Sequence, residues 1–353
     1  MSEFSQYGGA SDEWREIEKT IPIAPATEGM SLGERRRLMN EGREKVSAQA
    51  MESFKDQLHI KQHEISTRDD SSIQARSYRP AAYATSQLPV FLYFHGGGFM
   101  TGTLDTEDAT CARIAITAKV AVLHINYRHT PEFPYPTAWN DAEDGFKWLH
   151  QNIELLNGVP EKVIVGGISS GAMLTAALIL QKHHGKAVTE YPAIAGQVLM
   201  IPYLVHIDAY EPQLKKLIDP SVSSYKENEH APLLPVRAVR LFIDLLKIEN
   251  PDPLDLRTSP GNASSEQVRG LPPTTFGIAG LDPFRDEGLL FAKLLSEAGV
   301  PTDTYLFQGV PHAFRRFGQL SQAKRWDAVM SHAIEWSLSQ PKAQGFNIKT
   351  EGP

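Results

Sequence analysis

The stretch from residue 163 to residue 180 constrains the fold more than any other part of the chain. A short apolar run, the pentapeptide Gly-Ile-Ser-Ser-Gly at 167–171, and a longer apolar run rich in small residues follow one another there. This order is typical of a buried strand, a sharp turn and a buried helix. A Gly-x-Ser-x-Gly turn in that setting exposes a reactive serine, because its glycines let the strand and the helix approach closely. Ser169 is therefore a candidate nucleophile, although the pentapeptide alone also arises by chance.

A second glycine-rich turn, His-Gly-Gly-Gly-Phe at 95–99, comes directly after an apolar run at 90–94. Three successive glycines leave backbone N–H groups unobstructed, and acyl transfer needs such donors where negative charge develops on the carbonyl oxygen. The other donor expected for a serine nucleophile is the N–H of the following residue, here Ser170. The alternative is a tight turn with no chemical role. We interpret His95 as a structural side chain that fixes the loop, not as a base.

A carboxylate candidate follows a later strand, predicted at 274–279. Asp282 lies just beyond it, where sites form in open α/β sheets, and Pro283 fixes the turn. Asp286 and Glu287 are rivals, but they begin the next predicted helix, where carboxylates commonly complement the helix dipole. We therefore favour Asp282 as the acid.

The candidate base follows the last predicted core strand, at 302–307. The chain has 12 histidines, so position must distinguish one from the others. His312 comes after this strand and completes the order Ser, Asp, His along the chain. His183 and His184 instead end a predicted helix, where such side chains are expected anyway.

The core units alternate strand and helix over more than 200 residues, which predicts an α/β fold with a mostly parallel central sheet and helices on both faces. Strands are predicted at 63–67, 73–78, 90–94, 120–126, 163–165, 197–201, 274–279 and 302–307. Helices are predicted at 31–54, 106–119, 137–151, 172–180, 236–246, 286–298 and 320–337.

The segment rich in Pro, Asp and Glu at 204–260 interrupts this alternation, so we interpret it as a cap inserted over the site, with a surface elaboration as the alternative. The predicted organisation is an N-terminal helical cap segment, a first core part, the cap insertion, a second core part and a frayed tail, at 1–60, 61–203, 204–260, 261–341 and 342–353. Ser31 and Glu34 resemble a capping box at the start of the N-terminal helix. The run Arg35–Arg37 in that helix is interpreted as a solvated face.

Composition excludes several classes of function. A net charge of −7, from 35 Lys and Arg against 42 Asp and Glu, argues against nucleic acid or an anionic membrane as the main partner. Cys111 is the only cysteine, which rules out an intramolecular disulfide, and neither a signal peptide nor a transmembrane stretch is visible, so we expect a cytoplasmic protein with no stable membrane insertion. The sequence has no His-Glu-x-x-His motif or cysteine cluster, and we expect no metal and no cofactor.

Together these motifs resemble the hormone-sensitive-lipase-like branch of the α/β-hydrolase fold, which includes arylacetamide deacetylase-like and carboxylesterase-like enzymes. The resemblance covers about residues 75–335. It is carried by the segments 95–99, 126–132, 167–171, 282–286 and 312–314.

The resemblance implies roles for individual residues. It makes Ser169 the nucleophile, Asp282 the acid and His312 the base, and it implies that the backbone N–H groups of Gly97, Gly98 and Ser170 form the oxyanion hole. It also implies that Arg128 and Glu132, in the Tyr-Arg-His-Thr-Pro-Glu segment, shape the floor of the site. Phe99, Ile168 and Tyr203 are the candidate substrate-binding residues.

The pentapeptide at 167–171 departs from the Gly-Asp-Ser-Ala-Gly that is common in the family. Ile168 replaces the acid and Ser170 the alanine. No triad side chain is changed, but Ile168 removes a charge beside the nucleophile and suggests a more apolar pocket.

The expected function is cleavage of a carboxylic ester, a short acyl or acetyl ester of a small, largely apolar molecule, through an acyl-enzyme. The expected partner is this small-molecule ester, and a homodimer is left open. Two alternatives remain: a dehydratase or cyclase that uses the same site without an acyl-enzyme, and a non-catalytic receptor, against which the intact Ser, Asp and His argue.

Overall fold

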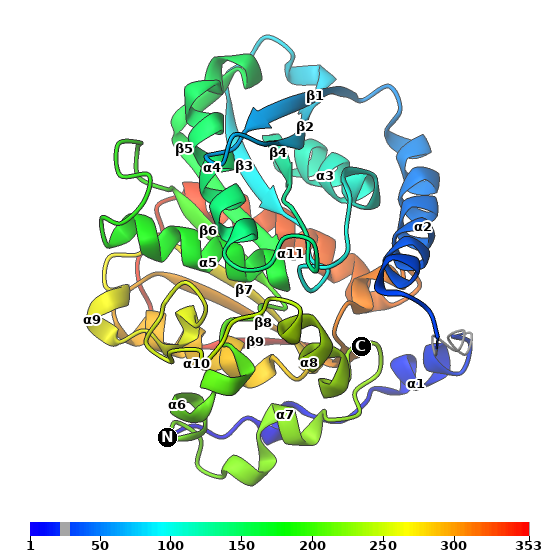
Figure 1. Cartoon of the computed structure of the whole chain (residues 1–353), viewed down its shortest axis with the longest axis vertical. Helices are drawn as coiled ribbons and strands as arrows, with labels where there is room; N and C mark the ends of the chain where they lie inside the picture. The colour runs from blue at the N-terminus through cyan, green and yellow to red at the C-terminus, as the bar shows by residue number, and fades with distance from the viewer. Residues whose placement is uncertain (22–28, 353) are drawn as a thin grey trace.

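The computed structural model describes residues 1–21 and 29–352, so residues 22–28 of the predicted N-terminal segment lie outside the described residues. In this described part of the chain, a nine-stranded sheet forms the centre of the molecule (Figure 1). Its strands are β1 (Leu58–Ser66), β2 (Ser72–Pro80), β3 (Leu88–Phe94), β4 (Ala121–Asn126), β5 (Gly158–Ile168), β6 (Gly196–Met200), β7 (Thr274–Leu281), β8 (Thr302–Pro311) and β9 (Ile348–Glu351).

The strands lie in the order β1-β2-β4-β3-β5-β6-β7-β8-β9. β2 runs antiparallel to β1 and to β4, and every pairing from β4 to β9 is parallel. The mostly parallel sheet predicted from the sequence is therefore confirmed. Because β5, β6, β7 and β8 are successive neighbours, their carboxyl ends meet along one edge of the sheet.

Helices cover both faces of the sheet, as Figure 1 shows. Helices α3 and α11 lie on one face, and α4, α5 and α10 lie on the other. The helices are α1 (Asp12–Glu18), α2 (Leu32–Met51), α3 (Leu104–Ala118), α4 (Thr137–Gln151), α5 (Ser170–His183), α6 (Glu211–Leu214), α7 (Ser224–Glu227), α8 (Val236–Asp244), α9 (Ser265–Val268), α10 (Arg285–Glu297) and α11 (Ser321–Leu338).

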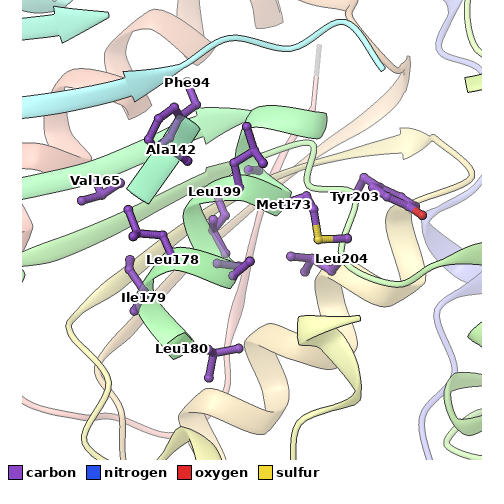
Figure 2. Packing of buried hydrophobic residues seen from close by; sticks show 14 of the residues in the cluster. Phe94, Ala142, Val165, Met173, Leu178, Ile179, Leu180, Leu199, Tyr203 and Leu204 are labelled. Carbon is purple, nitrogen blue, oxygen red and sulfur yellow. The ribbon is translucent and has the colours of Figure 1, made fainter. Parts of the chain in front are cut away.

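Two apolar cores result, one on each face of the sheet. Helix α5 is buried over most of its length, which explains its apolar and small side chains. Figure 2 shows Met173, near the start of this helix, beside Tyr203 and Leu204 of the segment that follows β6. The helix that carries the serine turn is thus held between the sheet and the segment that begins the predicted cap insertion.

The edge strands and strand ends differ from the sequence prediction. β5 begins at Gly158, not at 163, because Leu88 pairs with Gly158 before the register shifts along the strand. Between Gly158 and Val163 the strand contains Pro160 and the exposed, charged Glu161 and Lys162, which interrupt the apolar run. The frayed tail expected at 342–353 is also wrong in part, since residues 348–351 form β9 beside β8. An ion pair of 2.6 Å between Lys349 and Asp303 holds this strand.

Helix α2 begins with the predicted capping box. The hydroxyl of Ser31 accepts a hydrogen bond from the Glu34 N–H, and the Glu34 carboxylate accepts one from the Ser31 N–H. The interpretation of the arginine run as a solvated face is wrong for Arg36. Its guanidinium binds the Thr130 carbonyl and the Glu132 carboxylate, the latter at 2.6 Å, because α2 lies against the body of the protein.

Short helices fill the segment between β6 and β7. Figure 1 shows α6, α7 and α8 gathered at one end of the molecule, with the N-terminal segment beside them. Ser2 exchanges backbone hydrogen bonds with Lys216 and Ile218, and the Ser11 N–H binds the Gly309 carbonyl at 3.0 Å. The first residues of the chain therefore join this segment to the carboxyl end of β8.

Candidate active site

Ser169 lies at the sharp turn between β5 and α5. Its φ of 56° and ψ of −117° are strained for a residue with a side chain. The turn is possible only with glycine at 171, since a Cβ atom there would lie 2.0 Å from the Phe94 carbonyl oxygen. The Ser169 N–H is held by the Met200 carbonyl at 2.9 Å. The backbone is thus fixed on both sides of the serine, and the strand–turn–helix predicted from the pentapeptide is present.

The structure brings Ser169, His312 and Asp282 together. Nε2 of His312 lies 3.0 Å from Oγ of Ser169, and Nδ1 of His312 lies 2.6 Å from Oδ2 of Asp282. The other oxygen of Asp282 accepts a hydrogen bond from the Phe284 N–H at 3.0 Å, which fixes the orientation of the carboxylate. All three side chains are buried. This is the hydrogen-bonded order that a base-activated serine requires.

The rival carboxylates are bound elsewhere. Asp286 accepts a hydrogen bond from the Ser224 N–H at 2.7 Å and pairs with the fully buried Arg285 at 2.9 Å. Glu287 accepts one from the Leu204 N–H at 2.6 Å, and burial raises the pKa of its carboxyl well above the ordinary value. Asp286 and Glu287 therefore tie α10 to the segment between β6 and β7, while Asp282 binds the imidazole.

The glycine turn after β3 has the backbone that its sequence predicts. Gly97 and Gly98 have φ values of 145° and 61°, in the region that favours glycine. The Gly97 carbonyl accepts hydrogen bonds from the N–H groups of Met100 and Thr101 and from the Thr101 hydroxyl, at 3.0 to 3.1 Å. Gly98 is covered by the segment between β6 and β7, because a Cβ atom on it would lie 2.5 Å from the Phe242 ring of α8.

His95 lies behind this turn and is fully buried. Its ring stacks on Tyr127, with centroids 4.4 Å apart, and its Nδ1 lies 3.1 Å from the Gly96 carbonyl oxygen. Burial, with the neighbouring His129 and His124, lowers the pKa of His95 well below its ordinary value. The Tyr127 hydroxyl donates to the His95 carbonyl at 2.8 Å. These contacts fit the structural role predicted for His95.

Aromatic rings form a row that ends at the imidazole. Phe99 packs 6.4 Å from Tyr203, Tyr203 packs 5.2 Å from Phe284, and Phe284 meets His312 edge-on at 5.4 Å. Two of the predicted substrate-binding residues, Phe99 and Tyr203, therefore adjoin one another. Phe284 lies two positions after Asp282 in the sequence, yet its place in the row was not predicted.

The third predicted substrate-binding residue is Ile168. It is partly buried and packs against the core cluster on the opposite face of the sheet from α5, the cluster that contains Ile201 and Leu281. Arg128 and Glu132, the two residues expected to shape the floor of the site, both form ion pairs. Arg128 pairs with Asp141 at 2.6 Å and with Asp69 at 2.7 Å, and Glu132 pairs with Arg36.

Among residues 1–21 and 29–352, no group of three or more His, Cys, Asp or Glu side chains is arranged to hold a metal ion. In the same ranges, no helix combines the length and apolar character needed to cross a membrane.

Comparison with known proteins places this chain in a family. The sequence model described as alpha/beta hydrolase fold matches residues 91–316. Esterase LipI of Mycobacterium tuberculosis is 34% identical over 239 residues, which are 67% of this chain and 68% of LipI. Ethyl acetate hydrolase of Pseudomonas putida is 32% identical over 272 residues, 75% of this chain and 79% of that protein.

A solved structure agrees over almost the whole chain. The crystal structure of vibralactone cyclase matches with a TM-score of 0.85 and 28% sequence identity, covering 96% of this chain and 97% of that chain. The chain therefore belongs to the α/β-hydrolase fold family, in the carboxylesterase-like branch that its motifs resemble.

Proposed function

We propose that this carboxylic ester hydrolase works through a Ser169–His312–Asp282 triad and an acyl-enzyme. The single observation that supports this most strongly is the pair of hydrogen bonds at His312, 3.0 Å to Ser169 and 2.6 Å to Asp282. An imidazole held between a hydroxyl and a carboxylate can take the serine proton while the carboxylate stabilises the resulting charge.

In the first half of the reaction, Nε2 of His312 takes the proton from Ser169 as Oγ attacks the acyl carbonyl. The C–O bond of the ester then breaks, and His312 returns the proton to the departing alcohol. In the second half, His312 takes a proton from water, the hydroxide attacks the acyl-enzyme, and Ser169 regains its proton as the carboxylic acid leaves.

The negative charge on the carbonyl oxygen needs donors in both halves. We assign them to the N–H groups of Gly97, Gly98 and Ser170. The positive φ values of the two glycines and the position of Ser170 at the first residue of α5 support this assignment. Donors fixed in advance of the reaction stabilise the oxyanion without the cost of reorganising them.

The proposed substrate is a short acyl or acetyl ester of a small, largely apolar molecule. The aromatic row of Phe99, Tyr203 and Phe284 supports the apolar character, and Phe242 over Gly98 limits the space beside the oxyanion loop. The relative named ethyl acetate hydrolase is consistent with a short acyl group. In this proposal the segment 204–260, together with the N-terminal segment, caps the site.

The test is turnover of a short-chain aryl ester, such as p-nitrophenyl acetate, by the wild type and by Ser169→Ala. We expect the variant to lose essentially all catalysed turnover while its circular dichroism and melting temperature stay close to those of the wild type. Unchanged turnover in the variant would refute the assignment of the nucleophile.

A second candidate is a dehydratase or cyclase that acts on a small metabolite at the same site. The specific observation in its favour is the likeness to vibralactone cyclase over 96% of the chain. A reaction without an acyl-enzyme predicts no covalent adduct during turnover and only a partial loss on Ser169→Ala. A burst of alcohol release with accumulation of acylated protein would favour hydrolysis instead.

A further inference from the structure

Helix α2 holds the oxyanion loop from outside the sheet. The side-chain oxygen of Asn40 accepts a hydrogen bond from the Gly102 N–H at 2.9 Å. One turn further along the helix, Nη2 of Arg43 lies 3.5 Å from the Gly96 carbonyl oxygen, and Nη1 of Arg43 lies 3.5 Å from the Thr101 hydroxyl. A single guanidinium therefore meets the loop at two points.

Both contacts lead to peptide units that carry the assigned donors, one directly and one through the Thr101 hydroxyl. The Gly96 carbonyl shares its peptide plane with the Gly97 N–H, and the Gly97 carbonyl shares its plane with the Gly98 N–H. Arg43 approaches the first carbonyl directly. It approaches the second through Thr101, whose hydroxyl donates to the Gly97 carbonyl at 3.1 Å.

We propose that Arg43 is a positioning residue for the oxyanion hole, which orients and polarises the two peptide units of the Gly96–Gly98 loop. The inference rests on the proposed function, because it assigns a role to the same loop. A positive charge beside a peptide carbonyl draws electron density toward the oxygen and makes the N–H of that peptide a stronger donor. Chains of hydrogen bonds strengthen one another in the same way in a low-dielectric interior.

The ion pair of Arg43 with Glu107 fixes the position of the positive charge beside the loop. Glu107 of α3 accepts from Nη2 of Arg43 at 2.7 Å and from the Tyr93 hydroxyl at 3.0 Å. Burial acts to raise the pKa of Glu107, but the cationic groups around it, Arg43 first, hold that pKa below its ordinary value. Glu107 thus remains charged and fixes the guanidinium, while the guanidinium is the member of the pair that contacts Gly96 and Thr101.

The expected effect is smaller than the loss of a whole donor. Removing one oxyanion donor lowers kcat by about 10²- to 10³-fold, so weakening two donors should lower it about tenfold. The loss should fall on kcat and not on KM, because the oxyanion exists only in the transition state and in the tetrahedral intermediate.

The experiment compares Arg43→Met/Glu107→Gln with Glu107→Gln alone, so that no charged carboxylate is left unpaired in the interior. Arg43→Lys tests rescue by a retained charge. Arg37→Gln is the matched control, since Arg37 lies on the same helix with 72% of its side chain exposed. For each protein we would measure the melting temperature, kcat and KM for p-nitrophenyl butyrate, and the inhibition constants of a trifluoromethyl ketone and the matching methyl ketone.

The trifluoromethyl ketone adds to a serine as an oxyanion, whereas the methyl ketone binds as a neutral ground-state analogue. We expect the double variant to lose about tenfold in kcat and in trifluoromethyl ketone affinity relative to Glu107→Gln. Its KM and methyl ketone affinity should stay within about twofold, and Arg43→Lys should recover most of the loss.

Equal kcat and equal trifluoromethyl ketone affinity in the double variant and in Glu107→Gln would overturn the proposal. So would parallel losses for both ketones, which indicate a general disturbance of the site. If the wild type itself hydrolyses no ester, the proposed function fails and this inference falls with it. An active wild type with an insensitive double variant removes only the role of Arg43.

Discussion

The aromatic ring of Phe242 lies directly over Gly98. A Cβ atom added to Gly98 would approach Cγ of Phe242 to 2.5 Å, so the ring occupies the space that any side chain at position 98 would need. Phe242 belongs to α8 in the segment between β6 and β7, and Gly98 belongs to the turn after β3. The proposed cap thus touches the proposed oxyanion hole at this point.

This contact predicts a change of acyl preference in Phe242→Ala. Removing the ring frees space beside Gly98, so longer acyl chains should fit. Each methylene group that an apolar pocket accommodates is worth about tenfold or more in kcat/KM. We therefore expect the ratio of kcat/KM for p-nitrophenyl hexanoate to that for p-nitrophenyl acetate to rise at least about tenfold. Leu241→Ala, the adjacent partly buried residue of α8, is the control and should leave the ratio near that of the wild type. An unchanged ratio in Phe242→Ala would show that the ring does not limit the acyl group.

If Asp282 and not Asp286 is the acid, replacing each aspartate with asparagine should have opposite effects on activity and stability. Asp282→Asn should lower kcat by about 10⁴-fold, because an amide at this position supports the wrong imidazole tautomer and does not stabilise the imidazolium. Its melting temperature should change little by comparison. Asp286→Asn should keep most of kcat but lose about 3 kcal/mol of stability, because the fully buried Arg285 loses a charged partner. Kinetics combined with urea unfolding would separate these effects, and a reversed pattern would make Asp286 the acid.

The buried carboxyl of Glu287 should make the stability of the protein fall as the pH rises. Burial raises the pKa of its carboxyl well above the ordinary value, so the folded protein keeps a proton that the unfolded chain releases. Below the unfolded pKa both states are protonated, and there is no effect. Above it, stability falls by about 1.4 kcal/mol per pH unit until the folded pKa is reached.

Glu287→Gln removes this titration while keeping the acceptor for the Leu204 N–H. We therefore expect the variant to gain stability relative to the wild type as the pH rises from about 5, measured by urea unfolding at a series of pH values. The exposed Glu266→Gln is the control and should give a difference that does not depend on pH. A constant difference for Glu287→Gln as well would mean that Glu287 is ionised in the folded protein.

The sheet and the residues of the proposed triad were predictable because their signals are local. Apolar runs mark the parallel strands, and the carboxyl ends of neighbouring strands must meet at one edge. The pairing of β7 with β8 therefore brings the residues after them, Asp282 and His312, side by side. The capping box at Ser31 is local in the same sense, since its hydrogen bonds join residues three positions apart.

The remaining features depend on contacts between distant segments. Nothing near Phe242 in the sequence points to Gly98, and nothing near Arg43 points to Gly96. The amphipathic pattern of α8 predicts a helix with an apolar face, but not which loop that face covers. Arg36 was misjudged for the same reason, because its partners lie 94 and 96 positions away. β9 was missed because a four-residue polar strand carries no apolar alternation.

The most direct test of the central claim is mass spectrometry of the protein after incubation with a fluorophosphonate. The account predicts one adduct per chain, located by peptide mapping on Ser169, and no adduct at that site in His312→Ala, because the serine then lacks its base. Failure of the wild type to react, or an adduct on Ser170 or another serine in place of Ser169, would contradict the account.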